Sequence, residues 1–323
     1  MDQRKLIKLG NSSFAIALPK DWVDKAGLKK GDNIFITPNS NGELIIQSKY
    51  QGNSRNNKIV LNIENKSDKE IEREISSAYV RGFNVLELIG INEKKKDFID
   101  GLLKSLISLE IVEKNKDSLI VKDFFDLNEV NIESFLRRTD NSMRNMFEEM
   151  EVLLKKGSVS DKELKEIDEI DWDINRLYFL IYRVFIKSLE NPALLSTLKI
   201  DSLNVLDSWQ MAISIGKIGD ELKGVCKLVN REKKLKEKEK ILSLFLDTKK
   251  IYLEALLSYY NKDLELAKKV ISFREEQIKK YEELSRNKDI AVSQIAEKFE
   301  HIFSCVHEAS KLILYTTNQN GGK

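Results

Sequence analysis

The chain has 323 residues, of which 33% are charged, and its formal net charge is only +2. This length allows two or three domains, and three prolines in the whole chain favour a helix-rich protein. No apolar stretch approaches the roughly 20 residues that a membrane span requires, and the N-terminus lacks the apolar region of a signal peptide. We therefore expect a cytoplasmic protein without membrane insertion.

The first fifty residues predict a small β-rich unit. Two strand-like stretches are separated by Gly10-Asn11, a pair that tolerates positive φ. A short helix and two further strands are expected at residues 21–26, 33–37 and 43–47, with the hairpin signal Asn41-Gly42 between the last two. About fifty residues bury too little apolar surface to form a core of their own. A second copy of the unit is therefore expected to complete it.

This first unit is also basic. Residues 1–50 contain eight Lys and Arg against five Asp and Glu. A basic face on a small dimer is typical of proteins that bind nucleic-acid phosphates irrespective of sequence. The alternative is a solvated, charged hairpin that only dimerises, because charge runs are often just surface. We favour DNA binding.

A second unit is expected at residues 58–125, after a polar linker at 48–57. The pattern predicts strand, helix, strand, helix and a final hairpin. The first three lie at 58–63, 68–81 and 84–89, the second helix carries Phe98, Leu102, Leu106 and Ile107, and the hairpin spans 110–113 and 118–121. This α/β unit contains no glycine-rich phosphate loop, His or Cys. We expect a regulatory or dimer-supporting module, with a ligand pocket as the alternative.

From Asn131 onward the chain is predicted to be almost wholly helical, in two units of three helices. Their expected ranges are 131–156, 160–190 and 202–230, then 235–261, 262–287 and 288–316. Ser160 and Glu163 form a capping box at the start of the second helix, and Asn191-Pro192 ends it. The buried stripe of this helix is expected to consist of Leu164, Ile167, Ile174, Tyr178, Ile181 and Phe185.

Asp171 falls on this apolar stripe. A carboxylate in such a position is costly unless it is paired. Either Asp171 meets a basic or metal partner, or the helix is rotated so that Ile170 takes the core position. We favour the rotated helix.

The remaining reactive side chains do not suggest catalysis. Cys226 and Cys305 lie far apart in helical segments, which favours reduced buried thiols over a disulfide. His301 and His307 are six residues apart and do not share a face as helical zinc ligands would, so we expect ordinary surface or core residues. A weak metal or acid–base pair of His307 with Glu308 is the alternative. Without a nucleophile elbow, a Ser/His/Asp set or a Walker loop, we predict that the protein is not an enzyme.

Two runs in the first unit carry a family resemblance. Residues 10–20 read GNSSFAIALPK, and residues 26–32 read AGLKKGD. They resemble the AbrB/MazE/SpoVT swapped-hairpin DNA-binding family. The resemblance implies a homodimer whose chains exchange hairpins and present basic side chains to DNA. By position, the DNA-binding candidates it implies are Arg4, Lys5, Lys8 and Lys20, with Ser12 and Ser13 as hydroxyl donors.

The helical part carries a second resemblance. Residues 170–178 read IDWDINRLY, residues 216–220 read GKIGD, and residues 300–304 of the second unit read EHIFS. These runs, placed in two tandem three-helix units, resemble the PhoU family of phosphate-uptake regulators.

That family's metal sites use two acids four residues apart on one helix face. Asp220 and Glu300 remain here, but Gly216 and Ser304 replace the second acid of each pair. With Asp171, these two acids are the metal-site candidates, for a divalent metal or iron. The alternative is that they are satisfied polar groups at the bundle surface, because a multinuclear cluster needs several converging carboxylates.

The expected fold class is thus multidomain α+β. It comprises an N-terminal swapped-hairpin β domain, a small α/β middle domain and C-terminal all-α PhoU-like bundles, at residues 1–50, 58–125, 131–230 and 235–318. The arrangement resembles the archaeal form of the phosphate-uptake regulator and implies a dimeric, DNA-binding transcription regulator of phosphate homeostasis. One alternative is an adaptor that binds a phosphate transporter ATPase or a signalling protein such as a sensor kinase. Another is a carboxylate-metal oxidoreductase.

Overall fold

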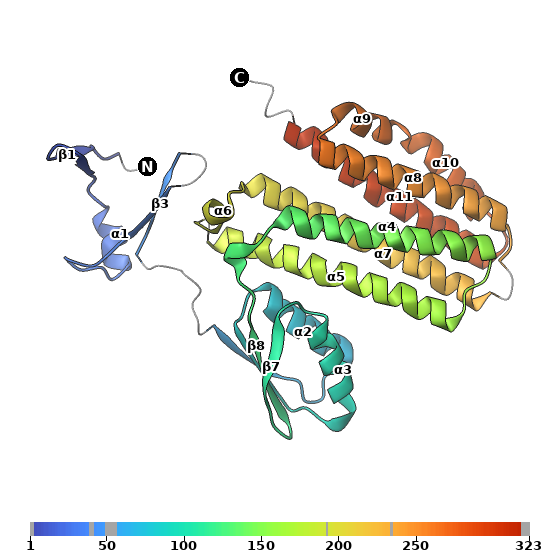
Figure 1. The fold of residues 1–323 in the computed structure, drawn as a ribbon, viewed down its shortest axis with the longest axis horizontal. Helices are drawn as coiled ribbons and strands as arrows, with labels where there is room; N and C mark the ends of the chain where they lie inside the picture. The colour runs from blue at the N-terminus through green and yellow to red at the C-terminus, as the bar shows by residue number, and fades with distance from the viewer. Residues whose placement is uncertain (1–2, 39–41, 49–56, 192, 233–234, 318–323) are drawn as a thin grey trace.

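A computed structural model describes residues 3–38, 42–48, 57–191, 193–232 and 235–317. Along the chain it has a small β unit, a two-layer α/β unit and a bundle of long helices (Figure 1). These are the three kinds of architecture expected from the sequence. Most of the expected linker, together with Asn41 and Pro192 of the two turn signals, lies outside the described residues.

The N-terminal unit consists of two separate hairpins with a short helix between them. Strand β1 (Ile7–Leu9) pairs antiparallel with β2 (Ser13–Ala15), and β3 (Phe35–Pro38) pairs antiparallel with β4 (Leu44–Gln47). Helix α1 (Lys20–Lys25) lies between the hairpins in the sequence. The turn after β1 places Gly10 at φ +69°, a conformation that favours glycine.

The middle unit is a four-stranded sheet with helices. Its strand order is β5-β6-β8-β7, and its elements are β5 (Lys58–Asn62), α2 (Asp68–Val80), β6 (Val85–Ile89), α3 (Glu93–Lys104), β7 (Leu109–Lys114) and β8 (Ser118–Asp123). Only β5 and β6 are parallel, because α2 carries the chain back between them. Leu86 and Leu88 of β6 are fully buried in one core with Ile71 and Ile75 of α2.

The remaining elements form the helical bundle. After a short 3₁₀ turn, η1 (Leu127–Glu129), they are α4 (Ile132–Lys156), α5 (Asp161–Glu190), α6 (Ala193–Leu198), α7 (Ser202–Arg231), α8 (Lys238–Asn261), α9 (Leu264–Ser272), α10 (Arg274–Ser285) and α11 (Ile290–Thr317). The rings of Phe147, Phe245 and Phe299 follow one another at centroid distances of 5.8 and 6.1 Å. Since these residues come from α4, α8 and α11, the two three-helix units share one continuous core.

The structure corrects two details of the helical prediction. The single helix expected at 262–287 is divided into α9 and α10, and the short helix α6 was not expected. At the division, the Ser272 hydroxyl donates to the Lys269 carbonyl at 2.7 Å, and the Phe273 amide donates to Val270 instead. A serine side chain that takes a backbone acceptor competes with the helical hydrogen bond, and at this point the backbone leaves the α-helical pattern. The capping box of Ser160 and Glu163 is present as predicted.

A buried ion pair joins the middle unit to the bundle. Asp123, the last residue of β8, accepts a hydrogen bond from Arg183 of α5, and their side chains are only 2% and 3% exposed. The Arg183 guanidinium also lies 5.0 Å from the ring centroid of Tyr79 in α2. In addition, Phe179, Tyr182 and Ile186 of α5 pack against the core of the middle unit. Helix α5 therefore belongs to both units.

The N-terminal unit touches the bundle through α6. The Ser196 hydroxyl donates to the carbonyl oxygen of Pro38, at the end of β3, at 3.1 Å. On its other side, α6 contributes Leu194 to a small core with Leu127 of η1, Val184 of α5 and Val205 of α7. The hairpin of β3 and β4 is thus connected to the bundle by the element that the sequence did not predict.

We expect the substitution Arg183→Met to lower the free energy of unfolding by about 3–5 kcal/mol, because it leaves the Asp123 carboxylate buried without its partner. Urea denaturation followed by tryptophan fluorescence measures the loss. The matched control is Lys162→Met, at an ammonium 87% exposed beside Glu166, which should change stability by less than about 1 kcal/mol. An equal effect of the two substitutions would contradict the prediction.

Candidate nucleic-acid interface and the carboxylates of the bundle

The N-terminal unit has no core of its own. None of its described residues, 3–38 and 42–48, is buried. Large apolar side chains on both hairpins and the segments beside them are more than half exposed, namely Leu6, Ile7, Leu9, Phe14, Ile16, Ile36 and Leu44. An isolated two-stranded hairpin is only marginally stable in water. The unit therefore presents uncovered apolar faces that need a partner surface.

The hairpin register decides which side chains share a face. Across β1 and β2, Lys8 lies opposite Phe14, while Ile7 lies opposite Ala15. Because opposite residues in an antiparallel pair point to the same side, one face carries Ile7, Leu9, Ala15 and Ser13, and the other carries Lys8 and Phe14. The first face is the more apolar of the two.

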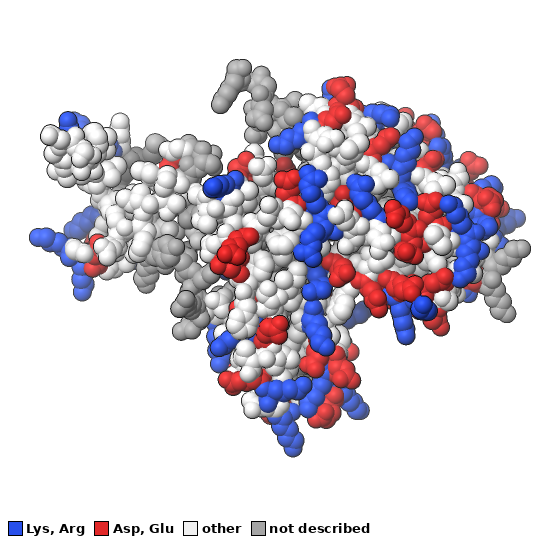
Figure 2. Space-filling model, viewed as in Figure 1, with Lys and Arg blue, Asp and Glu red and all other residues white. Residues whose placement is uncertain are grey.

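All six DNA-binding candidates are exposed. They are Arg4, Lys5, Lys8, Ser12, Ser13 and Lys20. The structure gathers Lys8, Ser12 and Ser13 on one hairpin and its turn, and it places Lys20 as the first residue of α1. In the view of Figure 2, the N-terminal unit is mostly uncharged, with basic side chains at its outer edge, whereas basic and acidic side chains are mixed over the bundle.

The favoured interpretation of Asp171 was wrong. The Asp171 side chain is buried, only 5% exposed, and accepts hydrogen bonds from Lys223 of α7 and from Asn175. The helix is not rotated, because Ile167 and Ile174 are buried as predicted and Ile170 is only partly buried. The physical reason is that Lys223 supplies the counter-charge that makes a carboxylate tolerable in this position. Gly219 of α7 leaves room for the Asp171 side chain, because a Cβ at this position would lie only 3.2 Å from a carboxylate oxygen of Asp171.

The other two metal-site candidates do not converge with Asp171 into a carboxylate cluster. The Asp220 side chain is 64% exposed and lies 3.6 Å from Lys223. Glu300 lies on α11. In this region an ion pair between α11 and α7 joins Lys298 to Glu221 instead, at 2.8 Å. Within the described ranges, no three His, Cys, Asp or Glu side chains form a group that could hold a metal ion. The residues present thus supply a lysine where a multinuclear cluster would need further oxygen ligands.

The histidines and cysteines have the environments expected of structural residues. His307 is 5% exposed and burial lowers its pKa, and its Nδ1 lies 3.6 Å from a carboxylate oxygen of Glu308, the pair named as the alternative. His301 is exposed, with its Nδ1 3.3 Å from a carboxylate oxygen of Glu221. Cys226 is buried and Cys305 is partly buried, and both thiols are free. Burial raises the pKa of Cys226 to about 12, which keeps it a neutral thiol at pH 7.

The fold and its exposed faces define a class of protein, in which an incomplete, basic β-hairpin unit is joined to an α/β unit and a helical bundle. Residues 7–53 match the family model described as antidote-toxin recognition MazE, bacterial antitoxin, and residues 136–229 match the PhoU domain. The chain thus has an N-terminal MazE/AbrB-like domain and a C-terminal PhoU domain. No curated protein and no solved structure matched it.

These two domains limit the functional classes. A MazE/AbrB-like domain suggests DNA binding and dimerisation, and PhoU suggests phosphate regulation; both are regulatory, non-enzymatic families. The PhoU match covers α4 to α7 and does not extend to α8–α11. Among the helices that the structure describes, none is both long and apolar enough to span a membrane.

We expect Lys223→Ala to destabilise the protein at pH 7 by about 1–3 kcal/mol, because it leaves a buried carboxylate without its charged donor. Burial already raises the pKa of Asp171, and the Lys223 ammonium opposes this rise. Without Lys223, the pKa of Asp171 should rise further, so that the carboxyl takes up a proton as the pH falls. The deficit relative to the unmodified protein should therefore shrink between pH 7 and pH 4, as measured by urea unfolding at both values.

The control for this experiment is Lys223→Ala in an Asp171→Asn background, where no buried charge remains and the pH dependence of the deficit should disappear. A deficit of the same size at both pH values in the single variant would show that Lys223 acts through packing alone.

Proposed function

We propose that the protein is a homodimeric, DNA-binding transcription regulator of phosphate homeostasis that works in the cytoplasm. The observation that carries the proposal is the N-terminal unit, in which the first hairpin and the segments beside it combine uncovered apolar side chains with exposed basic ones. Apolar faces favour association with a second copy, and the basic side chains of two copies together would form one phosphate-binding surface. Arg4, Lys5, Lys8, Ser12, Ser13 and Lys20 are the proposed DNA contacts.

The bundle would provide the regulatory input. Its contact with the DNA-binding end runs through α6, where Ser196 bonds to the Pro38 carbonyl of β3. If phosphate status changes the bundle, linkage requires that the free energy of DNA binding change with it. The competing function is an adaptor whose N-terminal unit only dimerises and whose bundle binds a transporter ATPase or a sensor kinase.

The dimer is tested by placing a charge on the more apolar hairpin face. We expect the unmodified protein to sediment as a dimer at micromolar concentration and Ile7→Asp to shift it toward the monomer, because the carboxylate would have to be buried on association. The matched control is Val152→Asp on α4, where the side chain is 61% exposed and should leave the sedimentation unchanged. A monomeric unmodified protein would contradict the proposal.

DNA binding is tested by fluorescence anisotropy with labelled promoter fragments of phosphate-transport genes, at two salt concentrations and with or without phosphate. We expect Lys8→Ala and Lys20→Ala each to weaken binding and to reduce the slope of log K against log salt by about 2, because in the homodimer each removes one phosphate contact from each subunit. Lys279→Ala, an exposed lysine of α10, removes the same charge and should leave the slope unchanged.

The opposite result would support the adaptor. If the protein does not bind the DNA fragments at low salt, or if neither substitution changes its binding, the hairpins serve only to dimerise the chain.

A further inference from the structure

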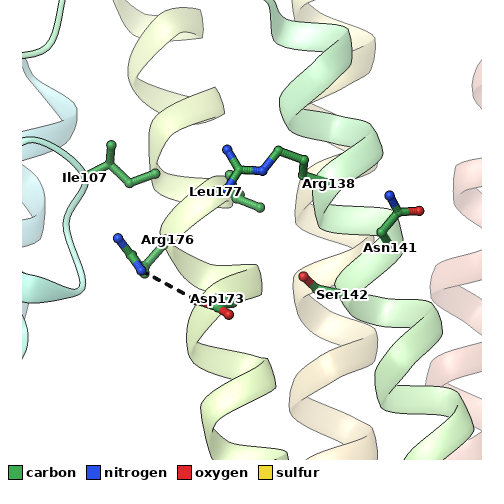
Figure 3. Close-up of a pocket in the computed structure, with 7 residues that line it drawn as sticks. All are labelled: Ile107, Arg138, Asn141, Ser142, Asp173, Arg176 and Leu177. Atoms are coloured by element: carbon green, nitrogen blue, oxygen red, sulfur yellow. Dashed lines mark ion pairs between the residues drawn. The ribbon is translucent and has the colours of Figure 1, made fainter.

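One pocket lies where the middle unit meets the bundle. Its volume is about 300 Å³, and it is lined by Arg138, Asn141 and Ser142 of α4, by Asp173, Arg176 and Leu177 of α5, and by Ile107 from the loop after α3 (Figure 3). It is therefore built from three segments, and one of them belongs to the other unit. None of the sequence-predicted site residues lines it.

Two guanidinium groups dominate its chemistry. Figure 3 shows the Arg138 side chain extending from α4 toward α5, where Arg176 and Asp173 lie. Within the described part of the chain, Arg138 has no ion-pair partner, and the buried Nε of Arg176 has no hydrogen-bond partner. The one carboxylate in the pocket, Asp173, approaches Arg176 only to 3.5 Å. The pocket thus has two cations against one anion, with donors left over.

We propose that this pocket binds inorganic phosphate. Arginine donates in a planar fork that matches the oxygens of a phosphoryl group, and two such forks suit a small dianion better than a carboxylate. Asn141 and Ser142 add neutral donors of the kind that complete an oxyanion site. Ile107 and Leu177 form the apolar part of the wall, whereas Arg138, Asn141 and Asp173 are exposed, so an anion could enter from solvent.

Asp173 gives the site its selectivity. A carboxylate beside an anion is repulsive unless the anion carries a proton that it can donate. Near neutral pH, inorganic phosphate retains at least one proton, whereas sulfate retains none. Phosphate can therefore donate a hydrogen bond to Asp173 while it accepts from Arg138 and Arg176, and sulfate of similar size would face an uncompensated negative charge.

Binding here would bear on regulation because of where the pocket lies. An anion held by α4 and α5 also lies against Ile107 of the middle unit, so it would stabilise one position of that unit on α5. This regulatory meaning rests on the proposed function, whereas the binding itself rests only on the pocket. The two can fail separately, since phosphate affinity is measured without DNA.

The test is isothermal titration calorimetry of the full-length protein with sodium phosphate and, separately, with sodium sulfate. We expect phosphate to bind more tightly than sulfate, and Arg138→Gln and Arg176→Gln each to weaken phosphate binding by about tenfold or more, because each removes charge-assisted hydrogen bonds. Asp173→Asn should reduce the preference for phosphate over sulfate. Arg286→Gln, at a guanidinium 78% exposed near the end of α10, is the matched control and should bind phosphate normally.

Three results would overturn the inference. The first is no binding of phosphate at millimolar concentration. The second is binding that both arginine substitutions leave intact while circular dichroism shows folded variants. The third is tighter binding of a phosphate monoester such as phosphoserine than of inorganic phosphate, which would assign the pocket to a phosphorylated molecule.

Discussion

The arrangement of the molecule depends on the ion pair of Arg183 and Asp123. Both side chains are almost fully buried, so each would be very costly without the other. The pair is not fully satisfied by hydrogen bonds, because Nε and Nη1 of Arg183 have none among the described residues. The guanidinium instead lies over the rings of Tyr79 and Phe125, and burial in this cluster raises the pKa of Tyr79 to about 12. A pair this demanding in geometry holds β8, α2 and α5 in one relative position.

That constraint makes α5 a shared element with two working faces. One face places Ile174 and Ile181 in the core of the bundle, and another places Phe179 and Ile186 against the core of the middle unit. The same joint brings the Ile107 loop beside α4 and α5, where the arginine pocket lies. The N-terminal unit is attached differently, through the Pro38 contact with α6. A change at the joint therefore has a route to the hairpins through α6, which packs against both η1 and α5.

Sequence periodicity predicted most of the long helices, because the residues that a helix buries recur at a regular spacing within one segment of the chain. The stripe through Ile167, Ile174 and Ile181 has the predicted phase, and Asp171 does lie on it. The prediction failed on the partner of Asp171. That partner, Lys223, is 52 residues away in the sequence, and a local sequence pattern contains no information on such a contact. The end of α9 was missed for a different reason. There the backbone hydrogen bonds change locally, with the Phe273 amide donating to Val270, and the spacing of hydrophobic residues does not show which carbonyl an amide will use.

The sequence by itself determined the three kinds of architecture, the chain order of nearly all elements and the exposed basic and apolar residues of the first unit, because these follow from periodicity, turn residues and the small size of that unit. Tertiary structure alone decided which charges meet. It paired Asp171 with Lys223 and Asp123 with Arg183, and it assembled Arg138, Arg176 and Asp173 around one pocket. Coulomb interactions and hydrogen bonds depend on distance in space, and the packing of β8, α4 and α7 against α5 sets those distances.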